Sequence, residues 1–341
     1  MIKVFIIDDS MLIRNSIKKI LKNEKNIILI GEAQNPVDAI DELKKVGFPD
    51  VFILDIEMPK MDGISFLRKL KEQKPIPTIV FSSIVGNNST KAIEALEFGA
   101  CEVIEKPINM NKIDKDDFVD EFIQKIKAAS KSKHVENDVI INKNTSKTNL
   151  LASKVIALGA STGGVQTIEN IITNLNKNHP PIVITQHMPA GFTKSFAKRL
   201  NNICPNSTVV EVQGDELLEV SCVYIAPGNL HLEIEKISKG KYKAILKDYP
   251  KVSNHKPSVD VLFKSVAKEA KNDSVAFILT GMGKDGANGI KKIKDAGGRT
   301  YGQDENSSIV YGMPKVAYEM DAIEKQVNLN ELVEIINSID K

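Results

Sequence analysis

Tryptophan is absent from the 341 residues, cysteine occurs three times and aromatic residues make up only 5%. Cys101, Cys204 and Cys222 are too scattered for a metal-binding spacing and cannot all pair, so we expect a reducing, cytoplasmic environment. No apolar run approaches the roughly 18 residues that span a bilayer. Acidic residues follow the first apolar run at once, so we expect neither membrane insertion nor a secretory signal.

An excess of charge of either sign is also lacking. The 46 basic and 44 acidic residues give a net charge of +2, and only four of the basic residues are arginine. A phosphorylation-controlled DNA-binding protein would need a helix-turn-helix and a basic face in its second half, and the sequence offers neither. We therefore expect no nucleic-acid partner. A length of 341 residues with 42% hydrophobic residues instead indicates two domains with substantial cores.

The first part of the chain alternates two hydrophobic patterns. Continuous apolar runs, typical of strands buried on both faces of a parallel sheet, lie at Val4–Ile7, Val51–Leu54, Thr78–Phe81 and, more weakly, Val103–Ile104. Between them, apolar residues with helical spacing fall into three sets: Ile13, Ile17, Ile20 and Leu21; Val37, Ile40 and Leu43; Ile64, Leu67 and Leu70. About five βα units predict a doubly wound, flavodoxin-like α/β domain over residues 1–128.

A polar segment without sustained periodicity follows. We interpret residues 129–153 as an interdomain linker, although a short helix or docking strip would also fit. From 154 to 341 the βα pattern resumes and predicts a second, Rossmann-like α/β domain. Its clearest elements are strands at Val155–Leu158, Ile182–Thr185 and Val275–Thr280, and a β-hairpin formed by Leu230–Ile234 and Tyr242–Leu246.

Acidic side chains gather where the strands of the first domain end. Asp8 and Asp9 come directly after the run Val4–Ile7, and Asp55 comes directly after Val51–Leu54. Ser82 comes directly after Thr78–Phe81, and Lys106 follows shortly after Val103–Ile104. Ligands of parallel α/β sheets bind at the carboxyl ends of the strands. Three converging carboxylates stay ionised only around a cation, and oxygen ligands favour Mg²⁺. With a lysine and a hydroxyl beside them, the set suits phosphoryl transfer onto a carboxylate.

Each aspartate alone could instead cap a helix or start a turn. Together with Met58-Pro59, Asp62-Gly63 and Lys106-Pro107, however, they match a known pattern in order and spacing, and residues 1 to about 125 resemble a response-regulator receiver domain. The resemblance implies that Asp55 is the phosphoacceptor, a histidine kinase the donor, and Ser82 and Lys106 the phosphate contacts. Val103 stands where receivers often carry an aromatic residue, which puts an aromatic-rotation switch in doubt.

A glycine-rich turn marks the second domain. The predicted strand Val155–Leu158 enters Gly159-Ala160-Ser161-Thr162-Gly163-Gly164 and then a helix, which fits the Gly-x-Ser-x-Gly nucleophile elbow. Such a turn exposes a serine hydroxyl beside backbone N–H groups that can stabilise an oxyanion. The same loop could cradle a phosphate, although it lacks the Gly-Lys-Ser/Thr ending of a P-loop.

A serine nucleophile needs a base, and the chain contains five histidines: His134, His179, His187, His231 and His255. His187 ends the next predicted strand, so it can face Ser161. Asp285 follows the strand Val275–Leu279 and could orient the imidazole, or could simply cap a helix. The order Ser, His, Asp differs from that of α/β-hydrolases, so that fold assignment does not transfer.

These residues stand in a longer series of motifs: Gln-His187-Met-Pro, Ala-Pro-Gly228, Lys-Pro-Ser-Val-Asp260-Val-Leu-Phe and Leu-Thr-Gly-Met-Gly-Lys-Asp285-Gly-Ala. Residues 154 to about 337 thereby resemble the catalytic domain of the chemotaxis methylesterases. The resemblance implies a triad of Ser161, His187 and Asp285, with the backbone N–H groups of Thr162 and Met282 as the oxyanion hole.

The same resemblance implies hydrolysis of glutamyl methyl esters on chemoreceptors, with release of methanol, and deamidation of receptor glutamines, in chemotaxis adaptation. It implies a monomer that needs no cofactor for the ester reaction and Mg²⁺ for phosphorylation, with the unphosphorylated receiver covering the catalytic site. The roles of His255 and Asp260 stay open. A rival hypothesis is a non-catalytic signalling module whose Gly159–Gly164 loop holds a nucleotide.

Overall fold

The computed structural model describes residues 1–83, 88–107, 116–132 and 154–339. Contacts divide the chain into two compact units, Met1–His134 and Val135–Lys341. The predicted linker lies outside the described residues from position 133 onward, so its conformation stays a prediction. Among the described residues, no helix combines the length and the apolar character that crossing a bilayer requires.

The N-terminal unit is built on a parallel sheet in the order β2-β1-β3-β4-β5. The strands are β1 (Ile2–Ile7), β2 (Ile27–Ala33), β3 (Val51–Leu54), β4 (Thr78–Ser82) and β5 (Ala100–Glu105). All neighbouring pairs run parallel. This is the flavodoxin-like order, so the predicted doubly wound fold is confirmed.

Five helices cover the two faces of this sheet: α1 (Met11–Lys22), α2 (Pro36–Val46), α3 (Gly63–Gln73), α4 (Asn88–Glu97) and α5 (Asp116–Ala129). One face packs against α1 and α5, where Ile17 and Phe122 join a single apolar cluster with Ile6 and Phe81. The opposite face contacts α3, where the Phe52 and Phe66 rings pack edge to face. Strands covered on both sides explain the continuous apolar runs in the sequence.

The predicted buried face of α2 was wrong. Val37 and Ile40 are 41% and 44% exposed, whereas Pro36 and Ala39 are buried. Pro36 and Ala39 also have helical spacing, so periodicity alone leaves the rotation of the helix undecided. The Asn35 side chain accepts from the first backbone N–H groups and fixes the start of the helix, which sets the rotation that buries the smaller residues.

The C-terminal unit contains a parallel sheet in the order β15-β14-β13-β6-β7-β10-β8. Its strands are β6 (Val155–Ala160), β7 (Ile182–Gln186), β8 (Thr208–Glu211), β10 (Cys222–Ile225), β13 (Ser274–Ile278), β14 (Arg299–Gln303) and β15 (Lys325–Val327). The predicted hairpin is present as β11 (His231–Ser238) and β12 (Lys241–Lys247), which pair antiparallel and are joined by the short β9 (Glu216–Leu217). The predicted α/β class is therefore confirmed.

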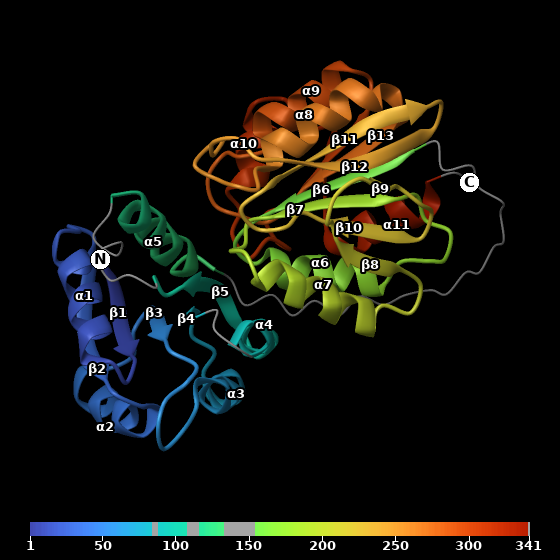
Figure 1. Ribbon diagram of the computed structural model, residues 1–341. Coiled ribbons are helices and arrows are strands. Elements are labelled where there is room, and N and C mark those ends of the chain that lie inside the picture. The colour runs from blue at the N-terminus through green and yellow to red at the C-terminus, as the bar shows by residue number, and fades with distance from the viewer. Residues whose placement is uncertain (84–87, 108–115, 133–153, 340–341) are drawn as a thin grey trace. The chain divides into compact units, whose positions relative to one another are not determined.

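Helices lie on both faces of the larger sheet (Figure 1). They are α6 (Gly164–Thr173), α7 (Phe192–Ile203), α8 (Val259–Glu269), α9 (Ala287–Asp295), α10 (Met313–Glu319) and α11 (Leu329–Ser338), with a short 3₁₀ turn at Lys271–Asp273. Helix α8 packs so closely on β6 that a Cβ at Gly159 would lie 2.1 Å from Val259 Cγ1. Close packing at the end of β6 holds the strand that leads to Ser161 against the start of α8.

The order of strands reverses beside β6. Strand β7 follows β6 in the chain and lies on one side of it, whereas β13, β14 and β15 extend on the other side. Ligands of open α/β sheets bind outside the carboxyl ends of the strands at such a reversal. The ends of β6, β7 and β13 therefore mark the place where a site is expected.

Candidate functional site

Ser161 directly follows β6, in a sharp strand-to-helix turn. Its backbone N–H donates to the Thr280 carbonyl at 3.0 Å, and its carbonyl accepts from the Gly164 N–H at 2.7 Å. Gly163 has a φ of 80°, a left-handed conformation that closes the turn before α6 and favours glycine. The serine is 7% exposed, so its hydroxyl lies in a restricted space at the sheet edge.

His187 occupies the corresponding position after β7. Its backbone N–H donates to the Ala160 carbonyl at 3.1 Å, which sets the histidine beside the serine turn. Its Nε2 lies 2.8 Å from Asp285 Oδ2, and its buried Nδ1 has no hydrogen-bond partner within the described part of the chain. An ionised carboxylate can only accept, so the proton belongs on Nε2 and the lone pair on Nδ1.

Asp285 is held by the start of α8. The carboxylate accepts from Ser258 Oγ at 2.8 Å and from the backbone N–H groups of Val259 and Asp260 at 2.7 and 3.1 Å. Burial by itself would raise the pKa of Asp285, but the His187 hydrogen bond and charge, with the Ser258 and Val259 hydrogen bonds, lower it below its ordinary value. The carboxylate is thereby kept ionised beneath the imidazole.

The His255 ring stacks on the His187 ring, with centroids 3.7 Å apart and planes within 11°. This contact was not predicted, because a lone loop histidine gives no sign of where its ring lies. Asp260 has a different place: its Oδ1 accepts from the Gly289 N–H at 2.6 Å and joins α8 to α9. Its side chain is thus a link between helices, while its backbone N–H contacts Asp285.

The two predicted oxyanion donors belong to segments that border Ser161. Thr162 is the next residue, and its carbonyl accepts from Thr280 Oγ1 at 3.0 Å. Met282 follows Gly281, where an added Cβ would lie 2.7 Å from Ser161 Cβ. A glycine at 281 is therefore needed for the second segment to approach the serine.

The other histidines in the described ranges, His179 and His231, have different hydrogen-bond partners. His179 hydrogen-bonds through its two ring nitrogens to the Pro180 carbonyl and Ser207 Oγ. His231 stacks on Tyr249, and its Nε2 lies 3.1 Å from the Pro250 carbonyl. Its Nδ1 accepts from the backbone N–H of Ser258 at 3.2 Å, and the Ser258 hydroxyl in turn donates to Asp285. His134 lies outside the described residues.

The N-terminal unit brings the predicted acidic residues together. Asp8, Asp9 and Asp55 each offer a carboxylate oxygen, and these oxygens lie within 4.8 Å of one another. Lys106 Nζ is 2.8 Å from Asp8 Oδ2 and 2.6 Å from Asp55 Oδ2. A compact set of carboxylate oxygens is the ligand set that a hard divalent cation prefers.

The protonation of this acid pocket differs from that of ordinary carboxylates. Burial raises the pKa of Asp55 to about 6; the charge of Lys106 opposes this rise and that of Asp8 adds to it. Burial also raises the pKa of Asp8, against the influence of Lys106. One lysine thus offsets only part of the cost of holding the carboxylates together, and a cation would favour their ionised forms.

Ser82 and Val103 are both buried near this pocket. The Lys106 N–H donates to the Ser82 carbonyl at 2.8 Å, and Ser82 Oγ makes a long 3.4 Å hydrogen bond to the Ser83 carbonyl. Val103 is 3% exposed, within β5. Because valine has no aromatic ring, a switch that depends on rotation of an aromatic side chain has no counterpart at this position.

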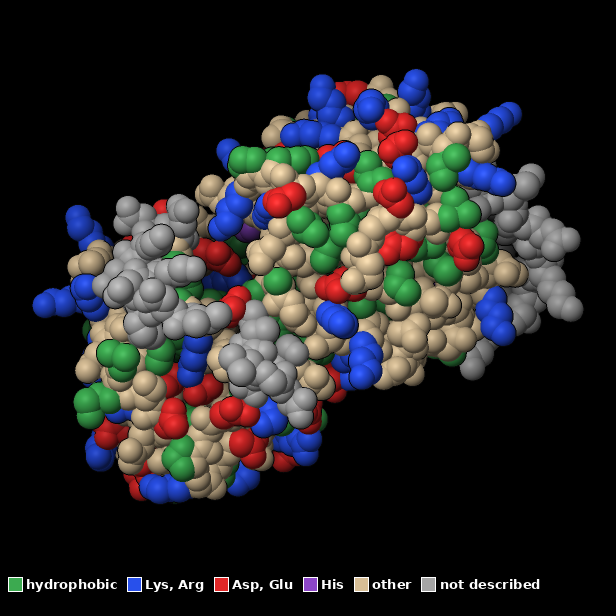
Figure 2. Space-filling view, in the orientation of Figure 1, with side chains coloured by type: hydrophobic (Ala, Val, Ile, Leu, Met, Phe, Trp, Pro, Cys, Tyr) green, Lys and Arg blue, Asp and Glu red, His purple; other side chains and the backbone are tan. Residues whose placement is uncertain are grey.

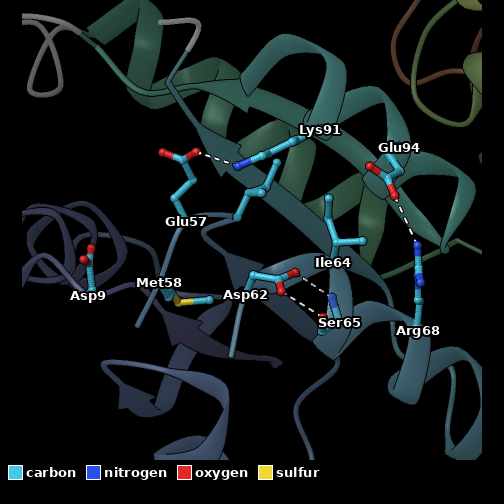
Figure 3. A pocket seen from close by; sticks show the side chains of 10 residues that line it. Asp9, Glu57, Met58, Asp62, Ile64, Ser65, Arg68, Lys91 and Glu94 are labelled. Atoms are coloured by element: carbon cyan, nitrogen blue, oxygen red, sulfur yellow. Dashed lines mark hydrogen bonds and ion pairs between the residues drawn. The ribbon is translucent and has the colours of Figure 1, made fainter. Parts of the chain in front are cut away.

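A cavity of about 630 Å³ opens beside Asp9, between the loop after β3 and helices α3 and α4 (Figure 3). Lys91 pairs with Glu57 at 2.8 Å, and Arg68 pairs with Glu94 at 3.2 Å, across its walls. Figure 2 shows basic and acidic side chains interspersed on the visible surface, as the balanced composition predicts. Of the residues of the acid pocket, Asp9 lines this cavity.

The two units together define a class of protein: a flavodoxin-like α/β domain with an acid pocket, joined to an α/β domain in which a serine turn lies beside a histidine that is hydrogen-bonded to a buried aspartate. Comparison with known families identifies both. The response regulator receiver domain family matches residues 4–116, and the CheB methylesterase family matches residues 156–336. The chain belongs to the CheB methylesterase family and carries a receiver domain.

Relatives and solved structures agree with this assignment. The chain is 43% identical to a protein-glutamate methylesterase/protein-glutamine glutaminase 3 of Leptospira interrogans, over 98% of each chain. It is 41% identical to a protein-glutamate methylesterase/protein-glutamine glutaminase of Yersinia pestis, over 97% of this chain and 95% of the relative. The crystal structure of the Thermotoga maritima CheB methylesterase catalytic domain is 38% identical, covers 55% of this chain and 98% of its own, and superposes with a TM-score of 0.52.

Proposed function

We propose that this protein hydrolyses methyl esters of glutamate side chains on chemoreceptors and deamidates receptor glutamines, in chemotaxis adaptation, and that phosphorylation of its receiver domain controls the reaction. The observation that carries this proposal is the arrangement at the end of β6, β7 and β13. A serine in a strand-to-helix turn lies beside the histidine that directly follows β7, and that histidine is hydrogen-bonded to a buried, ionised aspartate. These are the parts of a nucleophilic acyl-transfer site.

In the proposed reaction, Ser161 Oγ attacks the ester carbonyl while His187 Nδ1 takes its proton. The Nε2–H remains bonded to Asp285, whose charge stabilises the imidazolium that forms. The usual template uses Nδ1 for the aspartate and Nε2 for the serine, so the ring nitrogens here have exchanged roles. Triads are recognised by geometry, so this exchange preserves the chemistry.

The tetrahedral oxyanion would accept from the backbone N–H groups of Thr162 and Met282. His187 then returns the proton to the leaving methoxide, and methanol departs from the acyl-enzyme. Water, deprotonated by the same imidazole, releases the glutamate side chain and restores Ser161. With glutamine as the substrate, the leaving group is ammonia and the remaining steps are the same.

The receiver domain would supply the control. Asp8, Asp9 and Asp55 would hold Mg²⁺, a fit supported by the clustered oxygens of all three and by the raised pKa values of Asp8 and Asp55. The ion would neutralise charge on the phosphoryl group that Asp55 accepts from a histidine kinase. Lys106 and Ser82 would contact that group from the ends of β5 and β4.

Control of this kind requires only a modest free-energy difference. A 100-fold activation corresponds to about 2.7 kcal/mol between the less active and more active arrangements of the chain. One phosphoryl group with charge-assisted contacts can provide energy of this size. We place the receiver at residues 1–128, the linker at 129–153 and the catalytic domain at 154–341 of a cytoplasmic monomer.

The test is methanol release from methylated receptor membranes, measured with and without a small-molecule phosphodonor. The proposal predicts release that rises about 100-fold with phosphodonor and Mg²⁺. Ser161→Ala should lower kcat by ~10⁴–10⁶ if the triad acts as a unit. Normal demethylation by Ser161→Ala would refute the catalytic assignment, and tight nucleotide binding without methanol release would favour the non-catalytic module.

A further inference from the structure

The side chain of Gln186 links the backbone of the serine turn to the backbone of the histidine turn. Its Nε2 donates to the Ser161 carbonyl at 2.9 Å and to the His187 carbonyl at 3.1 Å. Gln186 is the last residue of β7 and is 2% exposed. One buried amide nitrogen therefore bonds to both of the residues that must exchange a proton.

The place of this link in the sheet explains its importance. Strands β6 and β7 pair up to Ala160 and Gln186, and the His187 N–H to the Ala160 carbonyl is a backbone bond just beyond the last pair. At Ser161 the chain turns into α6, so the ladder between the strands cannot continue. The Gln186 side chain carries the connection one step further, to the two residues of the reaction.

Gly164 provides independent support for this placement. A Cβ at Gly164 would lie 2.0 Å from Gln186 Oε1 and 2.7 Å from Ala160 Cβ. The glycine at the start of α6 therefore leaves the space that the Gln186 amide fills. Oε1 itself is buried without a hydrogen-bond partner in the part of the chain that the structure describes.

The amide has one favourable orientation. Exchanging its oxygen and nitrogen would turn Oε1 toward two carbonyl oxygens, which are acceptors only. The observed orientation donates to both carbonyls and leaves a buried oxygen without a partner in the described part of the chain, a cost that the two Nε2 hydrogen bonds offset. The amide is therefore held in the orientation that joins the two turns.

We propose that Gln186 is a positioning residue that holds the serine turn and the histidine turn at the separation that proton transfer from Ser161 to His187 requires. The inference rests on the proposed function. Proton transfer needs the two side chains within hydrogen-bond reach, and a displacement of about an ångström can cost ~10²-fold in rate. Gln186 acts through the two turns and does not itself touch the reacting atoms.

The variant Gln186→Met keeps an unbranched side chain of similar size and removes the donor. We expect a fall of ~10–100-fold in kcat for methanol release with KM changed less than about twofold, because the loss affects the transition state and not receptor binding. The apparent pKa of the rate profile should stay unchanged, since glutamine does not titrate. Gly164→Ala should give the same kcat loss by displacing the amide.

Thr185→Val is the matched control. Thr185 Oγ1 is buried on the same strand without a hydrogen-bond partner among the described residues. Valine has nearly the same shape as threonine, so the change removes a buried hydroxyl next to Gln186 and little else. Its kcat should stay within about twofold of the wild type. If Gln186→Met does not fold, Gln186→Asn supplies the test, because it keeps the donor but is one methylene too short to reach both carbonyls.

The deciding measurement is the second-order rate of labelling by a small fluorophosphonate, which reports serine activation without the receptor, on the full chain with phosphodonor. A ~10-fold or larger decrease for Gln186→Met, with Thr185→Val labelled normally, supports the inference. Wild-type labelling rates in Gln186→Met and Gln186→Asn, or an equal decrease in Thr185→Val, overturn it. A wild-type protein that neither is labelled nor releases methanol overturns the proposed function instead.

Discussion

Two buried aspartates, Asp55 directly after β3 and Asp285 in the loop between β13 and α9, have pKa values shifted in opposite directions. Asp285 is surrounded by donors from Ser258 and the start of α8 and by His187, and its pKa lies below the ordinary value. Asp55 faces Asp8 and shares one lysine with it, and its pKa rises to about 6. Burial disfavours charge at both places, but the hydrogen bonds and charge of the neighbours outweigh it at Asp285, whereas the charge of Asp8 adds to it at Asp55.

The difference separates two kinds of chemistry. A carboxylate that is already ionised can stabilise an imidazolium at once, as the proposed ester reaction requires. A carboxylate that resists ionisation gains most from an added cation, as the proposed phosphorylation requires. The two sites should therefore respond oppositely to loss of charge, to metal removal and to pH.

The largest effect is expected from Asp285→Asn. The asparagine oxygen can still accept from Nε2, but the charge is lost and the amide also allows the wrong tautomer of His187. We expect kcat for methanol release to fall by ~10⁴ with KM little changed. Steady-state kinetics of the variant with phosphodonor present would check this, and a loss below tenfold would show that the charge of Asp285 is not used.

A smaller effect is expected at the acid pocket. Asp55→Asn should abolish the roughly 100-fold response to phosphodonor and leave the basal rate of methanol release unchanged. Chelation of Mg²⁺ with EDTA should have the same outcome in the wild type, because the ion is needed only for phosphorylation. A basal rate that falls with EDTA would contradict the separation of the two sites.

The pH dependence of stability should also distinguish the aspartates. The pKa of Asp55 in the folded chain is about 6, above its ordinary 3.8, so its stabilising contribution is full below about pH 4 and is lost as the pH rises through 6. Without Mg²⁺, Asp55→Asn should therefore stabilise the N-terminal unit at pH 7 by on the order of 2 kcal/mol, and less at pH 4. The gain can be measured as the difference in protection factor of the β1 amides between Asp55→Asn and the wild type in hydrogen exchange. If this difference is the same at pH 4 and at pH 7, the prediction is refuted.

The smallest effect is expected from changes to His255, whose ring stacks on the His187 ring. His255→Ala removes the stacked ring from His187 and should lower kcat by ~10-fold, because the imidazole gains freedom to rotate. His255→Phe keeps a flat ring and should retain most of the activity. Equal losses in both variants would indicate that the chemistry of the imidazole, and not its shape, is what matters.

Much of the fold could be predicted from hydrophobic pattern. The apolar run Val51–Leu54 coincides with β3, and the hairpin was predicted from two alternating segments and a glycine turn. Strands such as Thr208–Glu211 and Arg299–Gln303 were missed because exposed polar residues and a glycine interrupt their patterns. The predicted rotation of α2 was wrong because two of its faces carry apolar residues with helical spacing.

The candidate sites were predictable to a different depth. Ser161 and His187 could be singled out because residues at the ends of parallel strands meet at one edge. The stacking of His255 and the link made by Gln186 could not, because each depends on how loops and side chains fold back in three dimensions. Which ring nitrogen of His187 bonds to Asp285 likewise depends on where the start of α8 holds that aspartate.

The proposal that Ser161 is the activated nucleophile has a direct test in the mass of its covalent adduct. The full chain, treated with phosphodonor and a fluorophosphonate, should gain a single adduct on the peptide that contains Ser161, with parallel loss of methanol release. The adduct should disappear in His187→Ala, which lacks the base. An adduct on another serine, or full methanol release by protein already modified at Ser161, would contradict the proposed mechanism.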